Sequence, residues 1–85
     1  MTHSVPLKLI YEAIPYIITI ETKTGDRYRG KLINIENNMN CYLSNTSTCI
    51  GGKFGKNHLL FIRGNCIKMI ILPDVLLETP ILKKN

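Results

Sequence analysis

The hydrophobic and polar positions predict one short helix followed by five strands. Near the N-terminus, apolar residues recur at the three- and four-residue spacing of one helical face: Leu7, Ile10, Tyr11 and Ile14. Ser4 can cap this helix, Pro6 suits its first turn, and Pro15 ends it. A helix this short is not stable alone, so we expect it to pack on the rest of the chain.

After Pro15 the period changes to two residues, which is typical of β-strands. The predicted strands are 16–21, 27–36, 41–48, 58–62 and 66–72. Turn-forming residues separate them at 24–26, 37–40 and 63–65. A segment rich in Gly and Lys, 50–57, is predicted to be a hairpin loop, and Asp74 is expected to cap a last turn that reaches Leu77. Short strands joined in this way indicate a small antiparallel barrel.

The strand 27–36 changes phase in its middle. Its first half places the cations on one face, at Arg27, Arg29 and Lys31, and the opposite face carries Tyr28, Gly30 and Leu32. Ile33 and Ile35 then become the apolar pair. A slip of one residue reverses the buried face unless the strand bends, and a glycine inside a strand marks such a bend. We therefore predict a long, strongly curved strand with its bend at Gly30.

Composition limits the class of protein. The 85 residues are enough for a single domain, which we expect to span 1–85 with a core of 5–77 and a basic tail of 78–85. Hydrophobic residues make up 45% of the chain, and β-branched side chains among them favour sheet, which excludes a helical bundle or a disordered chain. The net charge of +5 favours an anionic partner such as nucleic acid.

Several kinds of site are excluded by what the sequence lacks. Cys41, Cys49 and Cys66 have no C-x-x-C spacing and only two histidines accompany them, so we expect no metal, no cofactor and core or interface roles for the thiols. No signal peptide is visible, and the longest apolar run, 69–72, is too short for a bilayer, so we expect a reducing intracellular compartment and no membrane partner. The run 51–56 lacks the spacing of a nucleotide-binding loop, and no catalytic set of residues is present, so we expect no enzyme.

Two of the predicted turns carry side chains that can recognise a nucleobase. Asn38 and Asn40 have amides that both donate and accept hydrogen bonds. Arg63 offers a flat cation for stacking, and Gly64 allows a close approach to the backbone. A bent five-stranded sheet can bring both turns to one end, where they would hold a single unpaired nucleotide. Taken alone, the residue types of each turn favour an ordinary polar turn over a binding site.

The Gly- and Lys-rich hairpin offers a second, simpler kind of contact. Lys53 and Lys56 are expected to reach RNA phosphates from a flexible tip. Such contacts add affinity without reading sequence.

Two segments resemble the motifs of the Sm family. Residues 28–41 (Tyr-Arg-Gly-Lys-Leu-Ile-Asn-Ile-Glu-Asn-Asn-Met-Asn-Cys) resemble the first Sm motif, and 62–73 (Ile-Arg-Gly-Asn-Cys-Ile-Lys-Met-Ile-Ile-Leu-Pro) resemble the second. Segments 5–13 and 71–74 resemble the D-type branch of that family, the third D-type subfamily in particular. One departure is Asn37, where the family often has Asp.

The resemblance implies a fold and a set of site residues. The fold is mostly all-β, with an N-terminal helix on a strongly bent five-stranded antiparallel sheet that forms a small open barrel. In the site, Asn38 and Arg63 sandwich a base and Asn40 reads its edge. Gly64 and Asn65 shape the pocket.

The resemblance also implies a function. The chain would be a core subunit of spliceosomal small nuclear ribonucleoproteins, part of a heteroheptameric ring on uridine-rich single-stranded RNA in pre-mRNA splicing. Its neighbours would be B-type and G-type Sm proteins, in the nucleus after assembly in the cytoplasm. Strands 58–62 and 66–72 carry little charge to protect an exposed edge, which agrees with edge pairing between ring neighbours.

Two other functions remain open. A like-Sm ring in RNA decay would have the same fold and pocket and differ in its partners. A protein-interaction barrel would bind peptides and no RNA, and it would tolerate loss of Arg63 and Asn40.

Overall fold

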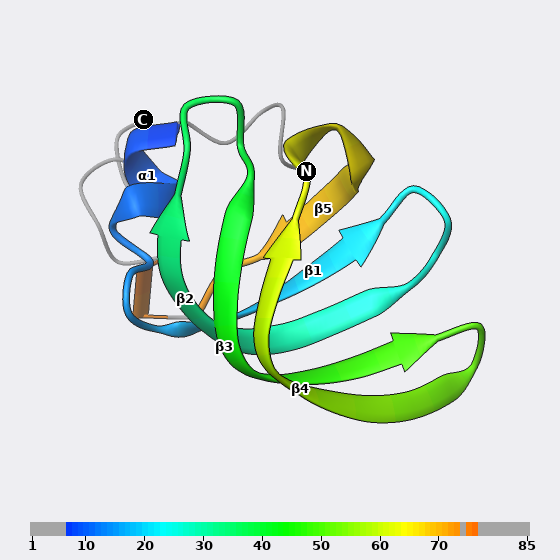
Figure 1. The fold of residues 1–85 in the computed structure, drawn as a ribbon. Coiled ribbons are helices and arrows are strands. Elements are labelled where there is room, and N and C mark those ends of the chain that lie inside the picture. Colours follow the sequence, from blue (N-terminus) through cyan, green and yellow to red (C-terminus); the bar gives the residue numbers. More distant parts are fainter. Residues whose placement is uncertain (1–6, 74, 77–85) are drawn as a thin grey trace.

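The described part of the chain folds as one short helix and five strands, as the sequence predicts (Figure 1). The computed structural model describes residues 7–73, 75 and 76. Its elements are α1 (Leu7–Tyr11), β1 (Ile17–Thr22), β2 (Arg27–Ile35), β3 (Cys41–Ile50), β4 (Lys53–Ile62), a 3₁₀ turn (Gly64–Cys66) and β5 (Ile67–Ile71). The expected helix start at Ser4 and Pro6, the turn from Asp74 to Leu77 and the tail 78–85 lie outside the described residues.

All strand pairs are antiparallel, and the sheet order is β4-β3-β2-β1-β5. The long strands bend sharply, so the sheet curls into an open barrel with α1 beside the end of β2 (Figure 1). The two edge strands are therefore β4 and β5, the strands that the sequence indicated as unprotected edges. The core lies inside the curl and is built mainly from Ile and Leu of every strand and of α1.

The helix is shorter than its predicted stripe. It ends at Tyr11, and the chain continues in tighter turns in which Ala13 N donates to Ile10 O (2.9 Å). Bonds of this i to i+3 kind place Ile10 and Ala13 above one another. Leu9, Ile10 and Ala13 are consequently buried, and Leu7 and Ile14 of the predicted stripe pack against the core. The stripe is wrong at Tyr11, which is 41% exposed.

Two bulges explain the change of phase in β2. Arg29 pairs with Ser47 but Lys31 pairs with Ser44, so β3 has one extra residue opposite Gly30. Further along, Leu32 pairs with Leu43 and Asn34 with Tyr42, so the extra residue there is Ile33 of β2. Leu32 and Ile35 are both buried because the bulge absorbs one residue between them, and Ile33 is 40% exposed. The predicted pairing of Ile33 with Ile35 on one face is wrong.

The bend at Gly30 agrees with the prediction and has a steric cause. A Cβ at this buried position would lie 2.7 Å from Thr46 Oγ1 and 2.9 Å from Ser44 O. At this position the backbones of β2 and β3 therefore approach too closely to leave room for a side chain.

This close approach of β2 and β3 leaves one buried hydroxyl without a hydrogen-bond partner, and we predict that Thr46→Val stabilises the protein. Among the described residues, only Thr46 Oγ1 is a buried side-chain oxygen that forms no hydrogen bond. A buried unpaired hydroxyl costs free energy, so its removal should raise the free energy of unfolding by about 1 kcal/mol. For a chain of this size, thermal unfolding should then shift upward by about 4–8 °C. Thr48→Val, at the next inward position, is the control and should shift it less; a lower melting temperature for Thr46→Val would contradict the assignment.

The predicted loop 50–57 is wrong, because most of it is strand. β3 continues to Ile50 and β4 begins at Lys53. Gly51 and Gly52 have φ of 57° and 80°, which is the conformation that closes a hairpin in two residues. Lys53 and Lys56 therefore lie on an ordered edge strand rather than in a flexible tip.

The three thiols are free and differ in burial. Cys41 is in the core, where burial raises the pKa of its thiol to about 12, whereas Cys66 is exposed. Within the described residues no helix is long and apolar enough to span a membrane. The same residues hold no cluster of three or more His, Cys, Asp or Glu side chains suited to a metal ion.

Candidate nucleic-acid interface

The turn between β2 and β3 touches the turn between β4 and β5. Gly64 N donates a hydrogen bond to Asn40 Oδ1 at 2.7 Å. A Cβ on Gly64 would overlap the carbonyl oxygen of Asn38 and lie 2.8 Å from the carbonyl carbon of Met39. Backbone therefore packs on backbone, and only glycine fits at this contact.

Asn40 is held on both sides of its amide. Its Nδ2 donates to Glu36 Oε1 at 2.8 Å, and Tyr42 Oη donates to the other oxygen of Glu36 at 2.9 Å. The hydrogen bond to Glu36 raises the pKa of Tyr42, and desolvation and the charge of Glu36 add to this shift. An amide has two N–H groups and two lone pairs, so one N–H and one lone pair of Asn40 remain for a ligand.

The backbone of the first turn is tightly closed. Glu36 N donates to Asn40 O at 2.9 Å, and Met39 N donates to Glu36 O at 2.8 Å. Met39 has a φ of 73°, uncommon for a residue with a side chain, and its side chain packs against the core. Asn38 Oδ1 accepts a hydrogen bond from Asn40 N at 3.3 Å. The amide nitrogen of the exposed Asn38 side chain takes no part in this bond. The turn is thus a fixed platform.

The second turn presents a cation. Arg63 has extended backbone and stands just before the 3₁₀ turn. Its side chain is exposed and forms no ion pair with any described residue. Asn65 is also exposed, and its Oδ1 accepts a weak bond from the Cys66 thiol at 3.5 Å. The guanidinium is therefore available for stacking on a flat ligand.

The structure gathers five of the seven predicted site residues. The two contacting turns contain Asn38, Asn40, Arg63, Gly64 and Asn65. Lys53 and Lys56 do not join them. The tip of the β3–β4 hairpin points away from the β2–β3 turn, and Lys56 stands seven residues before Arg63 along β4 (Figure 1).

Sequence reasoning missed the support of this site. Glu36 and Tyr42 hold Asn40 in place, and Met39 fills the space beneath the turn. One signal was present: Glu36 is the only acidic residue between Asp26 and Asp74, and it precedes the Asn-rich turn directly. Asn37, where the family often has Asp, accepts a hydrogen bond from Tyr11 Oη at 3.4 Å.

A cavity of about 420 Å³ adjoins the second turn. Its lining is mostly apolar and includes Tyr28, Leu60 and Ile62, together with Arg63 and Cys66. Burial raises the pKa of Tyr28, and the nearby Asp26 and Cys66 add to this. Because β4 is an edge strand, this cavity opens where a neighbouring molecule could cover it.

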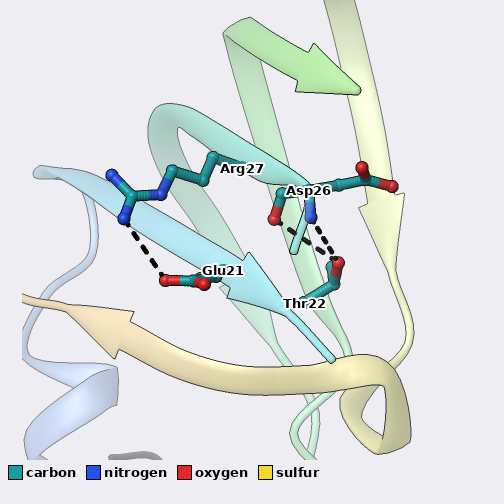
Figure 2. Close-up of polar contacts among 4 residues, drawn as sticks. All are labelled: Glu21, Thr22, Asp26 and Arg27. Carbon is teal, nitrogen blue, oxygen red and sulfur yellow. Dashed lines mark hydrogen bonds and ion pairs between the residues drawn. The ribbon is translucent and has the colours of Figure 1, made fainter. Parts of the chain in front are cut away.

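The β1–β2 turn beside this cavity is closed by its own side chains. Figure 2 shows Thr22 Oγ1 accepting from Asp26 N at 3.2 Å and donating to Asp26 O at 3.4 Å. In the same view Arg27 reaches Glu21 of β1, with 3.5 Å between nitrogen and oxygen. The turn is thus a rigid wall of the cavity.

Comparison with known proteins places this geometry in a family. The LSM domain model matches residues 8–72. The small nuclear ribonucleoprotein Sm D3 of Caenorhabditis elegans is 46% identical over 82 residues, which is 93% of this chain and 59% of that protein. Sm D3 of Schizosaccharomyces pombe is 40% identical over 81 residues, which is 94% of this chain and 84% of that protein.

A solved structure supports the fold. The Pyrococcus abyssii Sm protein, solved in complex with a uridine heptamer, superposes with a TM-score of 0.74 at 22% identity and covers 82% of this chain and 100% of its own. The chain thus spans 59% of the nematode relative, and the LSM domain match takes up most of this chain. From the domain match, the identities and the shared fold, the chain belongs to the LSM-domain family of Sm and Sm-like proteins.

Proposed function

We propose that this chain is a core Sm subunit of spliceosomal small nuclear ribonucleoproteins. In that role it forms part of a heteroheptameric ring that binds uridine-rich single-stranded RNA in pre-mRNA splicing. Its part is binding and assembly, without a catalytic step. The Sm D3 names of the nematode and fission-yeast relatives support this proposal, as does the uridine heptamer bound to the archaeal Sm protein.

The observation that carries the proposal is the bond between Gly64 N and Asn40 Oδ1. It joins residues 24 positions apart and brings the backbone that follows Arg63 against the fixed amide of Asn40. A cation for stacking and an amide for hydrogen bonding are the two elements that single-stranded RNA recognition uses. In the proposed complex, Arg63 and Asn38 enclose a base, Asn40 reads its edge, and Asn65 lines the pocket.

Assembly follows from the two sheet edges. Both β4 and β5 have one side without a partner strand, and Leu59, Phe61 and Ile71 on them are about half exposed. Unpaired edges with apolar side chains are an aggregation hazard unless another chain covers them. We propose that B-type and G-type Sm proteins cover these edges and the adjoining cavity, in a nuclear particle that assembles in the cytoplasm.

The pocket is tested by two substitutions in the ring reconstituted with its Sm partners. Arg63→Ala should weaken contact with one nucleotide by roughly five- to 100-fold, with little dependence on the base, because every base stacks. Asn40→Ala should instead relax the preference for uridine at that nucleotide. Crosslinking at single nucleotides is the measurement, since the other pockets would mask a loss in overall affinity.

Lys8→Gln, an exposed charge change on α1, is the matched control and should alter neither quantity. If both pocket variants leave contact and preference unchanged, the pocket assignment is wrong and the chain only spaces the ring. Mass spectrometry of co-purified partners separates the alternatives: RNA-decay subunits would indicate a like-Sm ring, and peptide-binding partners without RNA would indicate a protein-interaction barrel.

A further inference from the structure

The outer face of the β3–β4 hairpin carries cations around an exposed aromatic ring. In the sheet register, Arg27 lies opposite Cys49, which lies opposite Phe54. Two residues further along each strand, on the same face, Arg29 lies opposite Ser47, which lies opposite Lys56. Residues that are directly opposite share a face of the sheet. We call these six residues the hairpin patch.

The side chains of the hairpin patch are accessible. Phe54 is 89% exposed, the highest value among the exposed large hydrophobic residues of the described chain. Arg29 and Lys56 are exposed and form no ion pair with any described residue. Arg27 is 60% exposed, and its ion pair with Glu21 is long at 3.5 Å (Figure 2). Such a surface pair is weak and is readily exchanged for another anion.

The hairpin patch extends over three neighbouring strands, β2, β3 and β4. Neighbouring strands are about 4.8 Å apart and alternate residues about 7 Å apart along a strand. The two arginines on β2 therefore face Phe54 and Lys56 across about 10 Å. Ser47 and Cys49 on β3, between them, have small side chains. The larger side chains therefore stand at the sides of the patch, with the arginines on one side and Phe54 and Lys56 on the other.

The hairpin holds this surface in a defined position. Gly51 N donates to Asp26 Oδ1 at 3.1 Å, which ties the tip of the β3–β4 hairpin to the β1–β2 turn. The two-residue turn at Gly51 and Gly52 leaves no slack in the loop. The backbone that carries Phe54 is thus held in place, its ring lies in solvent, and Asp26 is occupied as an acceptor.

We infer that the hairpin patch is a second contact surface for single-stranded RNA, separate from the two-turn pocket. A base stacks on Phe54, and the phosphates beside it are bound by Lys56 and the two arginines. Stacking on an aromatic ring together with cations along the backbone is how proteins bind single strands without reading sequence. An acidic peptide would use the cations but leave the ring unused. The inference rests on the proposed RNA-binding role of the ring and extends the RNA path beyond the pocket.

The test uses the ring reconstituted with its Sm partners and two probes, a short oligouridylate and the same oligouridylate with a single-stranded extension. Phe54→Ala should weaken binding of the extended RNA by roughly fivefold or more, the loss expected for one stacked base. Phe54→Tyr should retain binding, and Phe54→Leu should lose it, because leucine keeps apolar area but has no π-face. Ultraviolet crosslinking should map the extension to the peptide that contains Phe54.

Charge is tested separately by the double substitution of Arg29→Gln and Lys56→Gln. Each phosphate contact on a single strand contributes about 0.7 to the slope of log affinity against log salt, so the slope for the extended RNA should fall by about 1.4. Lys8→Gln should leave the slope unchanged.

Unchanged affinity, slope and crosslinks across these variants would overturn the inference. Displacement of the extension from the unmodified ring by polyglutamate, with Phe54→Leu behaving as the parent, would assign the surface to acidic peptides and overturn it too. The short oligouridylate keeps this result apart from the pocket, because its crosslinks depend on Arg63 and not on Phe54.

Discussion

Gly64→Ala is expected to remove RNA contact at this subunit and to destabilise the fold. The added Cβ would overlap the carbonyl oxygen of Asn38 and lie 2.8 Å and 2.9 Å from two atoms of Met39. Two of these three atoms are backbone, so no side-chain rotation relieves the clash. The turns must separate, and the bond from Gly64 N to Asn40 Oδ1 is then broken.

The cost should be measurable in two ways. Overpacking of this kind costs about 3 kcal/mol, which lowers the melting temperature by more than about 10 °C in a chain of this size. Crosslinking at the nucleotide in the pocket should fall at least roughly tenfold, because stacking and edge recognition are lost together. Calorimetry of the variant and crosslinking of the reconstituted ring are the two measurements.

A second glycine supplies the matched control. Gly55→Ala makes the same chemical change on β4, where the Cβ would meet only the hydroxyl of Thr48 at 3.0 Å, an atom that can rotate away. This variant should melt within a few degrees of the parent and keep its RNA contact. If Gly64→Ala behaves like Gly55→Ala, the two turns are not held together as the structure describes.

The elements were predictable where side-chain period and turn chemistry agreed. The period of two after Pro15 predicted a strand where β1 lies, and the polar tetrapeptide after Glu36 marked the first turn. The error at the hairpin had a physical cause: glycine and lysine suggest a loop by composition, but only Gly51 and Gly52 need positive φ. The strands therefore run almost to the tip.

The register of β2 against β3 could not be predicted from the sequence. The change of phase at Ile33 marks the bulge in β2. The bulge in β3 opposite Gly30 leaves no such pattern, because Ser44, Asn45 and Thr46 are all polar. These two bulges offset one another, so the strands leave the bend in the register in which they entered it. A pattern read along one strand cannot show a shift that depends on its partner.

The candidate site was half predictable for a related reason. The residue types in the two turns pointed to base recognition, and the fold brought them together. What the sequence could not show is which of those side chains already has partners. Asn40 uses one N–H and one lone pair for Glu36 and Gly64, so the residue that we propose to read the base also braces the two turns. Loss of Asn40 should therefore be judged by nucleotide preference together with stability.

The bend that aligns the two turns gives the last prediction, that Gly30→Ala lowers stability strongly. Its Cβ would lie 2.7 Å from Thr46 Oγ1, 2.9 Å from Ser44 O and 3.1 Å from Thr46 Cα. Two of these atoms, Ser44 O and Thr46 Cα, belong to the backbone of β3. β2 and β3 must therefore move apart at a buried position. Insertion of a methyl group in a tight core costs about 1–3 kcal/mol, and each kcal/mol lowers the melting temperature by about 4–8 °C in a chain of this size.

A double-mutant cycle with Thr46→Ala separates the two sources of this cost. Thr46→Ala removes the closest atom but leaves the carbonyl of Ser44, so the double variant should recover part of the lost melting temperature and not all of it. Because the bend also sets where β2 and β3 deliver the Asn40 turn, RNA crosslinking by the ring should fall and recover in parallel with stability. A single variant that melts like the parent, or a double variant with no recovery, would show that the close crossing of β2 and β3 does not set the bend.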